Sequence, residues 1–406
     1  ALTDFSEFLL GKMNDAEIEK KFNVNTFLEN KKNLPNIKYV ITLDSDTDLS
    51  LNSAFELIGS MAHILNKPEI QEGKVIGGYG LIQPRVGINL DVSLKTIFTK
   101  IFAQNAGVDL YSNAISDIYQ DSFGEGIFTG KGIFDLKLYS KILKNEIPEN
   151  TVLSHDLLEG CYLRCGLASD ILLMDGYPCK YLSFMTRLSR WIRGDWQIID
   201  WLKSKKINLL SKYKIFDNLR RSLFEIFVLI TFFYLLIIEK INMQKNIFSI
   251  SFLIIVTMFP VLLEIFNYLV FRKEGEKKQN TFTTKFGGIK GTIYRGIIEF
   301  MTLPYKAYIS LKSITTALYR LKVSKKNLLE WMTSEEAENR SKENFKNYYK
   351  TMIFNAILGT IGILYFTKVK NIIGILIGIS WFIAPAVMCV ISRKIKLKNP
   401  KEKLGD

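Results

Sequence analysis

Up to about residue 205, short apolar runs alternate with amphipathic segments. The run 37–43 is rich in β-branched and aromatic side chains and predicts a buried strand, and 74–85 predicts another strand that glycines interrupt. Between these two runs, 53–65 has the pattern of a helix. Strands that alternate with helices predict an α/β sheet for this part of the chain.

Four long apolar stretches follow, at 222–238, 247–271, 352–367 and 371–392. The second and fourth reach the roughly 20 residues that a helix needs to cross a bilayer, whereas the first and third are shorter. Glu225 and Glu264 lie within the first two stretches, so we expect their carboxylates to face protein or water instead of lipid. The pattern predicts an α/β domain over 1–205, followed by an α-helical transmembrane region over 206–406.

Composition and charge fit this division. Hydrophobic residues make up 48% of the chain and charged residues 23%, which is typical of a soluble part joined to a membrane part. The net charge is +14, and the basic residues concentrate beside the apolar stretches and in the loop 272–351. By the positive-inside rule, the α/β domain, this loop and the C-terminus lie in the cytoplasm, which predicts a multi-pass membrane protein. The distribution indicates a lipid bilayer as partner and no nucleic acid.

Three further features have no assigned chemistry. Ile289–Leu321 is amphipathic, and such a helix can lie in the membrane interface or pack on the catalytic domain. Leu328–Trp331 is a compact motif whose purpose the pattern does not reveal. The 4 cysteines show no metal-binding spacing, so we expect core thiols in a reducing compartment.

Two aspartates directly follow the first predicted strand, at Asp44 and Asp46. Side chains at the carboxyl edge of such a sheet commonly bind ligands. Two carboxylates two residues apart can share one Mg²⁺ or Mn²⁺, which takes its other ligands from water and diphosphate oxygens. The alternative is a solvated acidic turn that caps the helix beginning near Ser53.

Two later segments supply candidates for chemistry on a sugar. The glycine-rich run Phe123–Gly132, which contains Gly130 and Lys131, permits a close backbone approach to a sugar or a growing chain. Asp156 can act as a general base that takes a proton from an acceptor hydroxyl, and His155 and Glu159 can tune it or orient the sugar. The alternative is that Ser154 or Asp156 caps the helix that follows.

A segment of arginine and tryptophan precedes the first apolar stretch. Guanidinium groups can neutralise a departing nucleotide diphosphate, and indole rings can stack on sugars. The alternative is a basic-aromatic helix close to the membrane. The candidate binding residues of this segment are Arg187, Arg190, Trp191, Arg193, Asp195, Trp196 and Gln197.

In this order, the motifs resemble those of processive, inverting family-2-like glycosyltransferases, such as cellulose and hyaluronan synthases. The similarity is closer still to the glycosyltransferase region of cyclic β-1,2-glucan synthases. The runs that carry it are Tyr39–Thr47, Gly78–Val86, Ser116–Gly132, Pro148–Gly160 and Arg190–Gln197, with Leu328–Trp331 extending it.

This resemblance implies a protein of the bacterial inner (plasma) membrane. Its catalytic domain over 1–205 would have a partial GT-A (nucleotide-diphospho-sugar transferase) fold, with UDP-glucose as donor. The resemblance also implies Mg²⁺ or Mn²⁺ at Asp44 and Asp46, Asp156 as base, and a β-1,2-linked glucan chain as product. Arg187, Arg190 and Trp191 would line the donor and acceptor sites. Members of the family are thought to build the chain attached to the protein, for which Tyr111 and Tyr119 are candidates.

The resemblance also has limits. Residues 1–36 are too few for the strands that hold the nucleotide in this fold, and the length-controlling domains of the family are absent. We therefore expect a segment that lacks its N-terminal nucleotide-binding half and works with the remaining domains of a larger synthase. Two alternatives stay open: another processive polysaccharide synthase, or a catalytically silent membrane component for glucan docking or export.

Overall fold

The computed structural model describes residues 2–22, 34–71, 73–103, 117–241, 246–270, 288–332, 336–338 and 344–395. The chain forms two compact units that interleave along the sequence. The first comprises Ala1–Ile88, Gly107–Gly176 and Gln197–Phe216, and the second comprises Asn89–Ala106, Tyr177–Trp196 and Asp217–Asp406. The predicted domain boundary at residue 205 stays a prediction.

The first unit contains a five-stranded sheet in the order β1-β6-β5-β7-β2. Strands β5 and β7 are parallel and the other neighbours are antiparallel. Its strands are β1 (Tyr39–Thr42), β2 (Asp48–Leu49), β5 (Leu81–Ile88), β6 (Gly132–Asp135) and β7 (Cys165–Asp175), and a separate hairpin joins β3 (Glu69–Gln71) to β4 (Lys74–Gly77). The strands predicted at 37–43 and 74–85 are confirmed, the second as two strands with a break at Gly78–Gly80. The prediction that the first strand is buried is wrong, because β1 lies at the edge of the sheet and all four of its residues are only half-buried.

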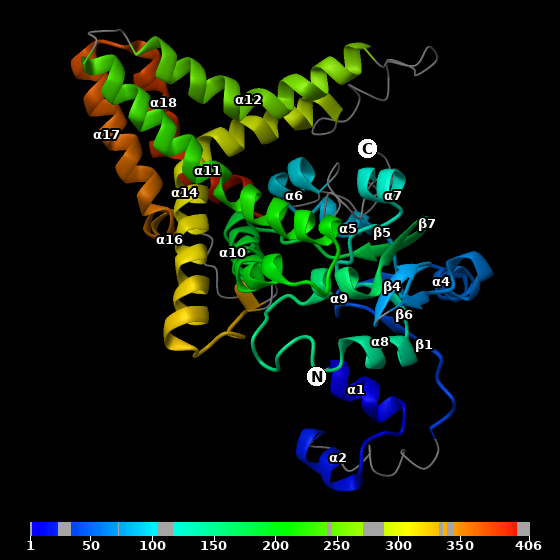
Figure 1. The fold of residues 1–406 in the computed structure, drawn as a ribbon. Helices are drawn as coiled ribbons and strands as arrows, with labels where there is room; N and C mark the ends of the chain where they lie inside the picture. Colours follow the sequence, from blue (N-terminus) through cyan, green and yellow to red (C-terminus); the bar gives the residue numbers. More distant parts are fainter. Residues whose placement is uncertain are drawn as a thin grey trace. The chain divides into compact units, whose positions relative to one another are not determined.

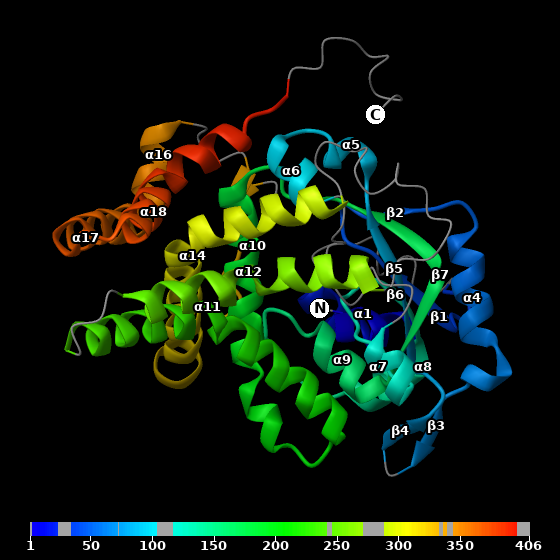
Figure 2. The same ribbon diagram turned by 90° about the horizontal axis from the view of Figure 1, so that it is seen from above.

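Helices cover both faces of this sheet (Figures 1 and 2). On one face, Leu57 and Met61 of α4 (Ser53–Ala62) form a buried cluster with Ile82, Ile133 and Ile171 of three strands. The other helices of the unit are α1 (Leu2–Leu9), α2 (Asp15–Lys21), η1 (Ile64–Asn66), α7 (Ile118–Phe123), α8 (Leu136–Leu143), α9 (Asp156–Leu163) and η2 (Ile199–Lys203). The α/β class predicted from the sequence is therefore confirmed.

The second unit is helical. It contains α5 (Leu90–Ser93), α6 (Ile97–Phe102), α10 (Tyr181–Gln197), α12 (Ile247–Val270), α14 (Gly288–Tyr319), η3 (Arg320–Ser324), α16 (Phe345–Thr351), α17 (Ile353–Val369) and α18 (Ile372–Ile391), whereas α11 (Leu209–Ile241) begins in the first unit. The amphipathic stretch predicted over 289–321 is α14, which places Ile298, Met301 and Tyr305 in a buried cluster with residues of α6, α10 and α18.

Among the described residues, three helices are long and apolar enough to cross a membrane. They span Leu209–Lys240, Ile247–Phe266 and Ile372–Ile391, which coincide with three of the four predicted stretches, and their insertion into a membrane stays a prediction. The stretch at 352–367 qualifies only if α16 and α17 count as one span, because the chain bends by 79° between them. All four cysteines are free thiols, and Cys165, Cys179 and Cys389 are buried, as expected for core residues.

Two prolines interrupt the hydrogen-bond ladders of α14 and α18. Pro304 and Pro385 have no backbone N–H, so the carbonyls four residues earlier, of Phe300 and Trp381, lose their usual helical donors. The indole Nε1 of Trp381 donates to the Phe300 carbonyl at 3.1 Å. One unpaired carbonyl is thereby satisfied from the neighbouring helix.

Asn355 of α17 bonds to the second unpaired carbonyl, that of Trp381, and to two backbone groups of α14. Its Nδ2 donates to the carbonyls of Trp381 and Met301, both at 2.8 Å, and its Oδ1 accepts from the N–H of Tyr305 at 2.7 Å. Met301 and Tyr305 are four residues apart, so the Asn355 amide is inserted into the ladder of α14. Asn355 is fully buried, and this one side chain joins three helices.

Candidate functional site

The Asp44–Asp46 segment forms a tight turn between β1 and β2. The N–H of Thr47 donates to the carbonyl of Asp44 at 3.1 Å. The Asp44 side chain is 57% exposed, so its carboxylate is open to a ligand. The N-cap of α4 is Asn52, and the alternative that this turn caps α4 is therefore wrong.

Lys131 links the turn to the interior of the first unit. Its Nζ lies 2.8 Å from Asp44 Oδ2 and 3.0 Å from Asp175 Oδ2 at the end of β7. Burial lowers the pKa of this ammonium, but the two carboxylates outweigh that effect and raise it overall, so Lys131 stays charged. The predicted glycine-rich loop thus delivers a fixed positive charge to the first aspartate of the turn.

Asp156 is the first residue of α9 and lies against the same loop. Gly130 has a φ of +91°, and a Cβ added there would lie 3.1 Å from the Asp156 carboxyl carbon. Only glycine combines that backbone conformation with so close an approach to the carboxylate. The structure therefore brings the glycine-rich loop and the predicted base together.

The surroundings of Asp156 favour its protonated form. Burial raises the pKa of the carboxyl, the charge of His155 lowers it, and the negative charges of Glu159 and Asp44 raise it further. A carboxylate with a raised pKa is a stronger base than an ordinary surface aspartate. The helix-cap alternative is wrong, because the N-cap of α9 is His155 and makes no side-chain capping bond.

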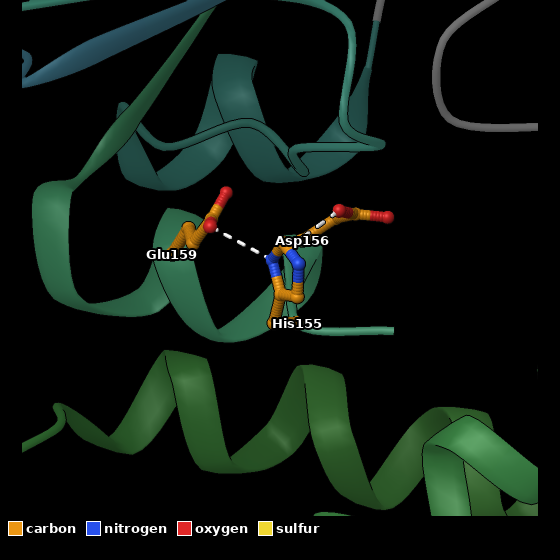
Figure 3. Close-up of side chains that lie close together, drawn as sticks. All are labelled: His155, Asp156 and Glu159. Carbon is orange, nitrogen blue, oxygen red and sulfur yellow. Dashed lines mark ion pairs between the residues drawn. The ribbon is translucent and has the colours of Figure 1, made fainter. Parts of the chain in front are cut away.

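His155 pairs with the buried Glu159 beside Asp156 (Figure 3), and the His155 side chain is itself 40% exposed. His155 Nδ1 lies 2.8 Å from Glu159 Oε1 and 3.8 Å from Asp156 Oδ1. The Tyr139 hydroxyl also donates to Glu159 Oε1, at 2.5 Å. The contact with Glu159 raises the pKa of His155 to about 9, against the opposing effect of burial, so the imidazole is protonated at neutral pH.

The same three residues meet a geometric criterion for a metal site. One ligand atom from each of His155, Asp156 and Glu159 lies within 4.8 Å of the others. A metal, however, needs a neutral imidazole nitrogen, whereas the Glu159 carboxylate stabilises the protonated ring. Glu159 Oε1 is already shared by Tyr139 and His155. A hydrogen-bonded ion pair explains this cluster better than a metal does.

Replacing His155 with glutamine is expected to shift the acid limb of the pH–activity profile to higher pH. The substitution removes the positive charge that lowers the Asp156 pKa, so a higher pH is needed to ionise the base. The measurement is kcat/KM against pH, with His63→Gln as control, since His63 is an exposed histidine. An unchanged acid limb would show that His155 does not act on the base.

The arginine-tryptophan segment forms most of α10 in the second unit. The Arg187 guanidinium stacks 4.7 Å from the ring centre of Trp191, and Arg190 stacks 4.9 Å from that of Trp331. Burial and the positive charges of Arg320 and Arg190 lower the pKa of Arg193. The positive charges of Arg190, Arg193 and Arg320 therefore lie close enough to repel one another, and such an arrangement favours binding of an anion. The Trp331 contact also gives the Leu328–Trp331 motif a position beside Arg190.

The last three residues of the segment make internal hydrogen bonds. Asp195 Oδ1 accepts from Asn218 at 2.9 Å, and Trp196 Nε1 donates to Ser222 at 2.9 Å. Gln197 is buried, and its Oε1 accepts from the Leu153 N–H at 2.7 Å, two residues before His155. These contacts fix the C-terminal end of α10, and the Gln197 contact also fixes the segment before α9. The predicted binding roles of these residues stay predictions.

The predicted attachment tyrosines differ in what the structure describes. Tyr111 lies outside the described residues. Tyr119 is buried, with Lys214 lying 5.6 Å from its ring centre and Tyr213 packed beside it. A hydroxyl in this position is that of a packing residue, and attachment at Tyr119 stays a prediction.

Three residues of the site were not predicted from the sequence: Asp175, Tyr139 and Gln83. Gln83 is fully buried, and its Oε1 accepts from the N–H and hydroxyl of Thr129, which fixes the glycine-rich loop next to Gly130. The available signal was a polar residue within an apolar strand. Such a residue needs a buried partner, because an unpaired amide costs about 1–3 kcal/mol.

The Asp44–Asp46 turn fits a hard divalent cation. The pKa of Asp46 is raised by burial and by the nearby charge of Asp175, so a cation there would relieve an existing accumulation of negative charge. Carboxylate oxygens are the ligands that Mg²⁺ and Mn²⁺ prefer. The residues present therefore suit the predicted metal.

Comparison with known proteins identifies a relative over nearly the whole chain. No protein-family model matches the chain. It is 31% identical over 402 residues to the cyclic beta-(1,2)-glucan synthase NdvB of Rhizobium meliloti (strain 1021). The matched region covers 96% of this chain and 14% of that synthase, so the chain spans a small part of its relative's length. The protein is therefore a relative of the cyclic β-glucan synthases, similar over nearly its whole length to one segment of such an enzyme.

Proposed function

We propose that this chain is the inverting glucosyltransferase segment of a cyclic β-1,2-glucan synthase, transferring glucose from UDP-glucose to a growing glucan. One observation carries the proposal. The glycine-rich loop touches the Asp156 carboxylate through Gly130 and the Asp44 carboxylate through the adjacent Lys131. A base and a candidate cation site therefore meet at two consecutive residues, which suits a hydroxyl acceptor on one side and a nucleotide diphosphate on the other.

Asp156 would take the proton of the acceptor hydroxyl as that oxygen attacks the anomeric carbon of the donor from the face opposite the leaving group. His155 stays protonated and, through Glu159, keeps a positive charge 3.8 Å from the base. This charge lowers the pKa of Asp156 and so favours its ionised form. A single displacement of this kind inverts the configuration at the anomeric carbon.

Asp44 and Asp46 would hold Mg²⁺ or Mn²⁺, which would neutralise the diphosphate of the leaving UDP. Within the second unit, the guanidiniums of Arg187, Arg190 and Arg193 would bind an anionic group, and Trp191 would offer an aromatic surface to a sugar. The two metal-binding carboxylates after β1 support the proposal of a GT-A-type fold. The basic residues beside the apolar stretches support a cytoplasmic active site. The apolar helices would anchor the chain in the bacterial inner membrane, and the small share of the relative that the chain covers supports its operation with further domains.

Membranes that contain this protein are expected to incorporate radiolabelled glucose from UDP-glucose into a polymer. Chelation with EDTA should abolish incorporation, because the diphosphate would lose its counter-charge, and Mg²⁺ or Mn²⁺ should restore it. Full incorporation in EDTA contradicts the metal assignment. If the Asp46→Ala and Asp156→Asn proteins incorporate as much glucose as wild type, the chain is a docking or export component instead of the enzyme.

A further inference from the structure

Asp175, the last residue of β7, is a buried carboxylate behind the Asp44–Asp46 turn, with only 1% of its side chain exposed. Its Oδ2 lies 3.0 Å from Lys131 Nζ, and its Oδ1 accepts from the Thr47 hydroxyl at 2.7 Å. Both oxygens are thus bound to side chains of the glycine-rich loop and of the turn. Asp175 therefore connects the two segments that carry the candidate site.

The residue after Asp175 contacts the second aspartate of the turn directly. The N–H of Gly176 donates to the Asp46 carbonyl at 3.1 Å. A Cβ at position 176 would lie 2.6 Å from Asp46 Oδ2, so any larger residue would displace that carboxylate. The end of β7 therefore holds Asp46 through its backbone and Asp44 through Lys131.

The charges of Asp175 and Lys131 have opposite consequences for a cation at this turn. The Lys131 ammonium lies 2.8 Å from Asp44 Oδ2, so it repels a second cation and competes for the same oxygen. Asp175 supplies a negative charge next to Asp46 and also draws Lys131 towards itself. Both side chains are almost fully buried, so water screens their charges weakly.

We propose that Asp175 and Lys131 are positioning residues that set the affinity of the Asp44–Asp46 turn for its divalent cation. Lys131 holds the Asp44 carboxylate in place and weakens cation binding. Asp175 restrains Lys131 and strengthens cation binding. The proposal rests on the proposed function, which assigns the cation to Asp44 and Asp46. A purely structural role predicts something different, because loss of either residue would then loosen the turn and weaken binding in both cases.

The test is the affinity of the detergent-purified protein for Mn²⁺, measured from the electron paramagnetic resonance signal of free Mn²⁺. We expect Asp175→Asn to weaken binding on the order of tenfold, because it removes a nearby negative charge and releases Lys131 towards Asp44. Lys131→Met should instead tighten binding by roughly the same factor. Asp170→Asn and Lys137→Met are exposed controls in the same unit and should leave the affinity unchanged.

Lys131→Met alone leaves Asp175 buried without its cationic partner, which can impair folding. The double variant Lys131→Met with Asp175→Asn avoids this, and it should bind Mn²⁺ more tightly than Asp175→Asn alone. Weaker or equal binding by the double variant, or an unchanged affinity in Asp175→Asn, overturns the inference while leaving the proposed function intact. A wild-type protein that binds no Mn²⁺ refutes the cation assignment itself.

Discussion

Replacing Asp156 with asparagine is expected to lower glucose incorporation from UDP-glucose by about 10²–10⁴-fold, the usual contribution of a general base. Asparagine keeps the size of the side chain beside Gly130 but cannot accept the acceptor proton. The effect should fall on kcat, with little change in KM for UDP-glucose, because Asp156 would act on the acceptor hydroxyl and not on the nucleotide. The measurement is initial-rate incorporation in membranes matched for protein content.

Asp170→Asn is the matched control for this substitution. Asp170 is an exposed aspartate of β7 in the same unit, so its replacement should leave incorporation unchanged. A kcat for Asp156→Asn within a few-fold of wild type would remove Asp156 from the chemistry. Equal losses in both variants would point to a general effect on the fold.

Replacing Asn355 with leucine is expected to give the largest loss of stability. It would leave the carbonyls of Trp381 and Met301 and the N–H of Tyr305 buried without their partner. Each such group costs about 1–3 kcal/mol, so the total is about 3 kcal/mol or more. We expect the unfolding temperature in detergent to fall by roughly 5–10 °C, as followed by tryptophan fluorescence.

A second substitution tests the cause of that loss. In the Asn355→Leu background, Pro385→Ala restores a backbone N–H that can donate to the Trp381 carbonyl within α18. We therefore expect the double variant to unfold at a higher temperature than Asn355→Leu alone. If Pro385→Ala lowers the unfolding temperature in this background, or leaves it unchanged, the free carbonyl is not the source of the instability.

Local patterns were enough to predict the elements that present the candidate site. The run of β-branched residues gave β1, and the aspartates that follow it form an accessible turn at the end of that strand. The glycines of the Phe123–Gly132 segment predicted a close backbone approach to a sugar or a growing chain, which stays a prediction, whereas the structure places Gly130 against Asp156. The metal, the donor and the roles of individual site residues stay predictions.

Features that depend on distant partners were not predictable in this way. Lys131 joins Asp44 to Asp175, and Tyr139 joins Glu159, yet nothing in the spacing of these residues marks the pairs. Buried charges need partners, but a single sequence does not show which partner the fold supplies. Asn355 is missed for the same reason, because an isolated asparagine in an apolar stretch does not identify the backbone groups that it satisfies.

The length of α11 was underestimated for a local reason. The apolar pattern covers only 222–238, whereas the helix begins at Leu209. The polar residues before the apolar stretch remain helical through ion pairs one turn apart. Asp217 lies 2.6 Å from Arg220 and 3.3 Å from Arg221, at the spacing that stabilises a helix.

The most direct test of the central claim is the linkage and anomeric configuration of the polymer that this protein makes from UDP-glucose. Methylation analysis gives the linkage, and NMR coupling constants of the anomeric protons give the configuration. An inverting enzyme that uses Asp156 as base converts the α-linked donor into a β-linked product, so we predict β-1,2-linked glucosyl residues that are absent from the Asp156→Asn sample. An α-linked product, a product without 1,2-linkages, or the same polymer from Asp156→Asn membranes would contradict the account.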